Sequence, residues 1–134
     1  VDTPHGLMVP KIRNVDKLGV KEIGQQLRTV SKLCKELKIE KKEFFGGSMT
    51  ISSLGGIGGV TFFTPIINPP EVSILGVGKS YDKVIKVDDK FITKKILPIS
   101  LSYDHRIIDG AEAARFSVHL SQSLGKDFAF KLAV

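Results

Sequence analysis

Cysteine is nearly absent from this sequence, and the single Cys34 excludes an internal disulfide. A reducing, intracellular setting is therefore the expected one. Cys34 falls on the apolar stripe of an expected helix, which favours core packing over a nucleophilic role. One cysteine and three scattered histidines are also too few for a zinc site, so no metal is expected.

Long apolar runs are lacking too, because glycine, proline or lysine interrupts each one, and this excludes a membrane-spanning segment. Residues 1–5 have neither the basic start nor the apolar core of a signal peptide. The chain does not begin with methionine, so we expect a processed or truncated protein. Its 42% hydrophobic and 25% charged residues are typical of a folded domain. We expect residues 1–134 to be one domain or part of one, with no second domain.

The sequence carries a net charge of +6, but the basic residues are not arranged as in a nucleic-acid-binding protein. They cluster in residues 32–42, on the polar face and tail of an expected helix, with little aromatic interleaving. A solvated helix face is the simplest interpretation, and a polyphosphate ligand such as a coenzyme is the better candidate if the charge is functional. The glycine-rich turn at 55–59 fits neither a phosphate loop nor a dinucleotide fingerprint.

The hydrophobic patterning predicts several strands and two helices. Such a set favours a two-layer α/β (α+β) sandwich, in which helices cover a mixed or mostly antiparallel sheet. A hairpin is expected around Asp88-Asp89. The expected helices span 19–38 and 110–124, and the expected strands span 7–13, 48–52, 72–77, 84–87, 91–92 and 96–103.

The most informative segment runs from Asp104 to Gly110 and reads D-H-R-I-I-D-G. It joins an expected strand to an expected helix, where His105 can be held rigidly and still be reached by a substrate. Such a histidine can act as a general base near neutral pH. Asp109 stands at the helix N-cap, and a glutamate three residues later completes a D-x-x-E capping box. Asp104 and Arg106 are interpreted as a local ion pair.

Two chemistries are consistent with a base at this position. Ser-His-Asp hydrolysis would use Ser52 or Ser53 as the nucleophile and Asp104 or Asp109 to orient the ring, but the G-x-S-x-G elbow is absent. The strand–turn context T-I-S-S-L-G equally suits a hydroxyl that donates a hydrogen bond to a developing oxyanion.

The segment D-H-R-I-I-D-G, preceded by L-P-I-S-L-S-Y and followed by A-E-A-A-R-F, resembles the active-site segment of the dihydrolipoamide acyltransferases. These proteins form the core of the 2-oxo acid dehydrogenase complexes. The resemblance extends to residues 1–10, 46–56 and 64–78, and it is strongest to the bacterial pyruvate-type branch. The chain resembles the C-terminal part of the catalytic domain, and nothing in it resembles a lipoyl or a peripheral-subunit-binding domain.

The resemblance implies a chloramphenicol-acetyltransferase-like fold, with homotrimers that pack into cores of twenty-four or sixty subunits. The active site is then expected between neighbouring subunits. His105 would take the proton from the coenzyme A thiol, Ser52 would hydrogen-bond the tetrahedral oxyanion, and Asp109 would support the catalytic geometry. Ser53 is the alternative oxyanion donor. Phe63, which the sequence alone does not separate from its neighbour Phe62, and Asp2 would line the substrate channel.

The implied reaction moves an acetyl group between a dihydrolipoyl arm, carried by a lipoyl domain outside this chain, and coenzyme A in the pyruvate dehydrogenase complex, downstream of glycolysis. The implied partners are the 2-oxo acid dehydrogenase and dihydrolipoamide dehydrogenase components, bound through upstream domains, with no nucleic acid and no membrane. The expected location is the bacterial cytoplasm, or the mitochondrial matrix in a eukaryote. The alternatives are a branched-chain or succinyl transferase of the same family, a stand-alone acetyltransferase of the chloramphenicol type, and a non-catalytic structural core.

Overall fold

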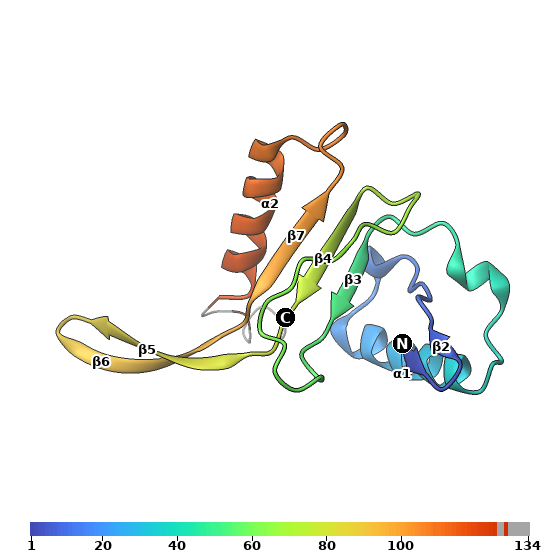
Figure 1. The fold of residues 1–134 in the computed structure, drawn as a ribbon, viewed down its shortest axis with the longest axis horizontal. Helices are drawn as coiled ribbons and strands as arrows, with labels where there is room; N and C mark the ends of the chain where they lie inside the picture. Colours follow the sequence, from blue (N-terminus) through green and yellow to red (C-terminus); the bar gives the residue numbers. More distant parts are fainter. Residues whose placement is uncertain (126–127, 129–134) are drawn as a thin grey trace. The chain divides into compact units, whose positions relative to one another are not determined.

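The structure, a computed structural model, describes residues 1–125 and 128. These residues form two compact units, one made of residues 1–47 and the other of residues 48–128 (Figure 1). Among the described residues, no helix is long and apolar enough to cross a lipid bilayer. Within the same ranges, no three histidine, cysteine, aspartate or glutamate side chains gather closely enough to hold a metal ion.

The first unit is built around helix α1 (Val20–Lys35). The Gly19 backbone N–H donates a 2.7 Å hydrogen bond to the Glu22 carboxylate, which caps the start of the helix. Cys34 is fully buried, which confirms its predicted place in the core. The helix ends before Leu37, whose φ of 55° is left-handed, so it is shorter than the predicted 19–38. The unit also contains β1 (Asp2–Thr3), β2 (Gly6–Leu7), and the 3₁₀ helices η1 (Val15–Lys17) and η2 (Lys41–Phe44).

The strand predicted at 7–13 is wrong beyond Leu7, where the chain becomes irregular. Pro10 has no N–H to offer to a ladder. Met8 exchanges backbone hydrogen bonds with Val1, whereas Lys11 and Arg13 bond to the region of η2. The Lys11 backbone N–H donates to the Glu43 carbonyl at 2.8 Å. The Arg13 guanidinium donates to two backbone carbonyls, those of Lys42 at 2.8 Å and Phe45 at 3.0 Å.

The second unit contains a mixed three-stranded sheet of β3 (Thr50–Ser53), β4 (Ser73–Val77) and β7 (Ile99–Tyr103). Central β4 is parallel to β3 and antiparallel to β7, which confirms the predicted mixed sheet. Its residues Ile74 and Leu75, which point to opposite faces, are only 5% and 9% exposed, so both faces of this strand are covered. Helix α2 (Gly110–Ser123) follows β7 and runs beside it (Figure 1), with Ala113 buried.

Strands β5 (Tyr81–Val87) and β6 (Lys90–Ile96) form the hairpin predicted around Asp88-Asp89. Both aspartates have positive φ, 47° and 60°, as a two-residue type I′ turn requires. The hairpin is longer than predicted, and Ile96 belongs to it. The last strand therefore begins at Ile99 rather than at residue 96, because Pro98 separates the two strands.

Candidate active site

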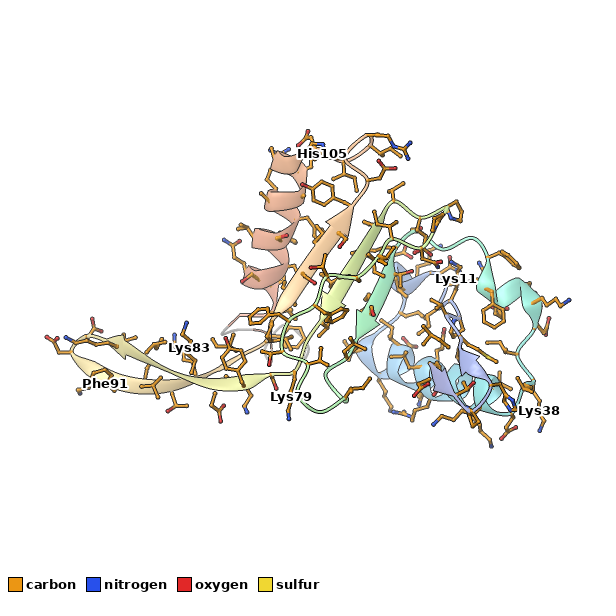
Figure 2. All side chains as sticks on the ribbon, viewed as in Figure 1. Lys11, Lys38, Lys79, Lys83, Phe91 and His105 are labelled. Atoms are coloured by element: carbon orange, nitrogen blue, oxygen red, sulfur yellow. The ribbon has the colours of Figure 1, made fainter. Side chains whose placement is uncertain are left out.

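The loop that carries His105 is a closed turn tied to the sheet. The Asp104 backbone N–H donates to the Val72 carbonyl at 2.8 Å, and the Asp104 carbonyl accepts from the N–H groups of Ile107 and Ile108, both at 3.0 Å. The exposed imidazole of His105 lies at the end of β7, beside the first turn of α2 (Figure 2). A histidine is thus presented to the outside by backbone that hydrogen bonds hold in place.

Asp104 and Arg106 form the predicted local ion pair. The Arg106 guanidinium donates from Nε to Oδ1 at 2.9 Å and from NH2 to Oδ2 at 2.6 Å, and its backbone N–H adds a bond to Oδ1 at 3.0 Å. These hydrogen bonds lower the pKa of Asp104 to about 2. The carboxylate therefore stays ionised until the pH falls that far, and it takes up no proton near neutrality. Asp104 is excluded as the general base, and both of its oxygens are already bound.

The structure confirms the predicted role of Asp109 as the N-cap of α2. Its Oδ1 accepts a 2.8 Å hydrogen bond from the Glu112 backbone N–H at the start of α2. The Glu112 carboxylate, which a full capping box would direct back to Asp109, lies 3.9 Å from Arg115. Asp109 thus fixes the point at which the loop becomes helix, four residues after His105.

Replacing Asp109 by alanine is expected to lower the free energy of unfolding by about 1 kcal/mol, because the cap would leave a helix N–H without its partner. Denaturant unfolding of the full-length protein measures this change. Asp109→Asn is the matched control, since asparagine caps helices about as well as aspartate, and it should keep the wild-type stability. Equal losses in the two variants would contradict the capping role.

Tyr103 is a neighbour of His105 that the sequence did not single out. The two rings lie 5.6 Å apart between centroids and are tilted by 40°. Tyr103 is half-buried at the end of β7, whereas His105 is exposed, so the tyrosine ring lies against one side of the imidazole. Strand β7 ends at Tyr103, so the alternation of side chains along a strand does not reach His105 and gave no signal for this contact.

Ser52 lies on a different part of the same sheet. In the sheet register Ser52 is opposite Gly76, and Gly76 is opposite Ser100, so the three share one face. The Ser100 hydroxyl donates a 2.7 Å hydrogen bond to the Phe63 carbonyl. The Phe63 ring reaches to 3.2 Å from the point where a Cβ on Gly76 would stand, so this ring lies against Gly76 on the face that Ser52 shares.

The structure distinguishes the members of the two residue pairs, Ser52/Ser53 and Phe62/Phe63, that the sequence alone could not. Ser53 is opposite Val77, on the other face of the sheet from Ser52. Phe62 is 70% exposed, whereas Phe63 is half-buried against the sheet. The structure thus brings Ser52 and Phe63 to one face, and it places Ser53 elsewhere.

Ser52 and His105 do not meet within one chain. Ser52 lies two strands away from Ser100, about 10 Å across the sheet. His105 lies beyond Tyr103, which is roughly another 10 Å along β7 from Ser100. A hydrogen bond between the serine and the histidine of one chain is therefore out of reach, and a Ser-His-Asp triad does not form within it.

Asp2, the remaining candidate, belongs to the first unit. It lies in β1, opposite Leu7 in β2, and its side chain is exposed. Its proposed place in a substrate channel stays a prediction.

The chain is similar to known acyltransferases over nearly its whole length. The family model described as 2-oxoacid dehydrogenases acyltransferase (catalytic domain) matches residues 1–129. The dihydrolipoyllysine-residue acetyltransferase component of the pyruvate dehydrogenase complex of Cupriavidus necator is 53% identical over 123 residues. That match covers 92% of this chain and 22% of the relative, so the chain spans about a fifth of the relative's length.

Two solved structures share the fold. One was used to study a serine, a histidine and an asparagine in the catalytic mechanism of Azotobacter vinelandii dihydrolipoamide acetyltransferase; its TM-score is 0.89 at 46% identity. The other, at TM-score 0.89 and 45% identity, is the cubic core of the pyruvate dehydrogenase multienzyme complex. Each match covers 96% of this chain and 53% of the solved chain. The histidine and asparagine of the Azotobacter enzyme stand four positions apart, as His105 and Asp109 do here.

Proposed function

Because the chain belongs to the 2-oxoacid dehydrogenase acyltransferases, as part of their catalytic domain, we propose that its full-length protein moves an acetyl group between a dihydrolipoyl arm and coenzyme A. The observation that carries this proposal is the exposed His105, held in a closed turn between β7 and α2. Both oxygens of Asp104 are bound by Arg106 and Asp109 caps α2, so His105 is the remaining side chain of this motif that can serve as a base.

His105 is the general base of the proposed reaction. Its imidazole takes the proton from the coenzyme A thiol, and the thiolate attacks the thioester carbonyl of the acetyl-dihydrolipoyl group. The tetrahedral intermediate then expels the dihydrolipoyl sulfur, which recovers the proton from the imidazolium. One thioester is made as another is broken, so the step needs a positioned base more than a driving force.

Ser52 is the proposed donor to the oxyanion of that intermediate. Its place on the face where the Phe63 ring lies against Gly76 supports this choice over Ser53, which faces the other side of the sheet. A hydroxyl aimed at the developing charge stabilises the transition state more than the ground state. Phe63, on the same face, would line the channel that leads to this donor.

The proposed site lies between two copies of the chain, with His105 from one subunit and Ser52 from the next. The separation of these residues across the sheet supports this arrangement. A cyclic homotrimer supplies such a repeated heterologous interface. Because a related structure is a cubic core, we propose that these trimers pack into a cubic assembly of twenty-four subunits.

The proposed setting is a bacterial pyruvate dehydrogenase complex in the cytoplasm, as the bacterial acetyltransferase relative suggests. Lipoyl and peripheral-subunit-binding domains outside residues 1–134 would supply the acyl-carrying arm and the contacts with the 2-oxo acid dehydrogenase and dihydrolipoamide dehydrogenase components. Asp2 is proposed as a residue of the substrate channel.

The acyl group is tested by offering the full-length protein acetyl-CoA, succinyl-CoA and a branched-chain acyl-CoA with free dihydrolipoamide as the acceptor. We expect acetyl-CoA to give the highest kcat/KM. A higher value with succinyl-CoA or the branched-chain substrate would assign the protein to another branch of the family. Faster transfer to chloramphenicol than to dihydrolipoamide would contradict the proposed acceptor.

A further inference from the structure

Gly110 is the first residue of α2, and nothing in the part of the chain that the structure describes requires a glycine there. Its φ lies outside the left-handed region, so any residue can adopt its backbone conformation. A Cβ at this position would meet only Tyr103 Oη at 3.8 Å and His105 Nε2 at 4.0 Å among the described residues. Both distances are ordinary van der Waals contacts, so an alanine fits without displacing its neighbours.

Helix propensity makes this glycine more conspicuous. Glycine is a poorer helix former than alanine, so helix formation alone does not favour a glycine at this position. Natural sequences depart from such local preferences chiefly at functional sites. The two atoms that the absent side chain would touch are the hydroxyl of Tyr103 and the nitrogen of His105.

We propose that Gly110 determines access to the base: its lack of a side chain keeps open the approach to Nε2 of His105. This inference rests on the general-base role proposed above. A base must come within hydrogen-bonding distance of the atom that gives up its proton. A methyl group 4.0 Å from Nε2 would stand in the shell through which the coenzyme A sulfur must approach.

Tyr103 closes one side of the His105 ring, so the approach past Gly110 matters more for access to Nε2. Its ring lies against the imidazole, with centroids 5.6 Å apart, so the imidazole has little freedom to turn away from a new methyl group. A side chain at position 110 would therefore narrow the approach to Nε2 while leaving the turn and the cap of Asp109 intact.

The test compares Gly110→Ala with Gly24→Ala in the full-length protein. Gly24 lies inside α1, where a Cβ would come no closer than 3.8 Å to the flexible guanidinium of Arg28. Both variants replace a helical glycine, so both should keep or raise the melting temperature. Only Gly110→Ala should lower acetyl transfer, by about 10-fold or more, because a misplacement of roughly 1 Å at a reacting centre can cost on the order of 100-fold.

A second readout does not depend on the reaction. Diethyl pyrocarbonate modifies accessible neutral imidazoles, and mass spectrometry can follow the rate at each of the three histidines. In Gly110→Ala the rate at His105 should fall several-fold relative to His5 and His119, which are exposed in the structure. The same ratio should be unchanged in Gly24→Ala.

Unchanged labelling of His105, unchanged transfer, or a lower melting temperature in Gly110→Ala would each overturn the inference. If the wild-type protein transfers no acetyl group but His105 labelling still slows in the variant, the proposed function fails and the claim about access to Nε2 stands. Slower labelling together with slower transfer at full stability supports both.

Discussion

Replacing His105 by alanine should lower acetyl transfer by roughly 10²- to 10⁴-fold, the contribution of a positioned general base. The imidazole is exposed in a turn whose hydrogen bonds come from the backbone of residues 104, 107 and 108. Its removal therefore should not disturb the fold, and the melting temperature should stay close to that of the wild type. The loss should appear in kcat, because the imidazole acts on the thiol proton rather than on the bulk of the coenzyme.

The assay follows transfer from acetyl-CoA to free dihydrolipoamide by the full-length protein. His119→Ala is the matched control, because His119 is an exposed histidine on α2, outside the proposed site. That variant should keep wild-type turnover. Full activity in His105→Ala would remove this residue from the mechanism, and equal losses in both variants would point to a general effect on α2.

Replacing Ser52 by alanine should lower kcat by about 10²- to 10³-fold, as the loss of one oxyanion donor does in comparable sites. The Michaelis constant for coenzyme A should change little, because the hydrogen bond forms fully only in the tetrahedral intermediate. Ser52 is half-buried, and a smaller alanine fits the same position.

Ser53→Ala is the matched control for Ser52→Ala. Ser53 is the next residue of β3, and its side chain points to the opposite face. Its loss should leave turnover within about 2-fold of the wild type, as expected for a hydroxyl that contributes nothing specific to the transition state. A large loss in Ser53→Ala with little change in Ser52→Ala would reverse the assignment.

The elements with strong local signals could be predicted from the sequence. The apolar repeat of α1, the N-cap at Asp109 and the Asp88-Asp89 turn each depend on a few neighbouring residues, and all three are present in the structure. The extent of the strands was predicted less well. Residues 8–13 resemble a strand, but Lys11 and Arg13 bond to the region of η2, which lies more than thirty residues away in the case of Lys11.

The sequence alone could not say which residues face the site. Ser52 and Ser53 are equivalent in composition and context, and only the pairing of β3 with β4 assigns them to opposite faces. Phe62 and Phe63 can likewise be told apart only in the structure, because the Phe63 ring is the one that closely approaches Gly76. The contact between Tyr103 and His105 depends on the turn at Asp104, which the sequence pattern does not determine.

The most direct test of the central claim mixes subunits of His105→Ala with subunits of Ser52→Ala, each of which should keep about a hundredth of the wild-type activity or less when assembled alone. If each site takes its base from one subunit and its oxyanion donor from the next, random co-assembly should restore about a quarter of the wild-type activity, as a cyclic heterologous interface requires. Mixing His105→Ala with the double variant should restore none. Recovery only in the first mixture is the predicted result, and no recovery in fully mixed oligomers would contradict a site shared between subunits.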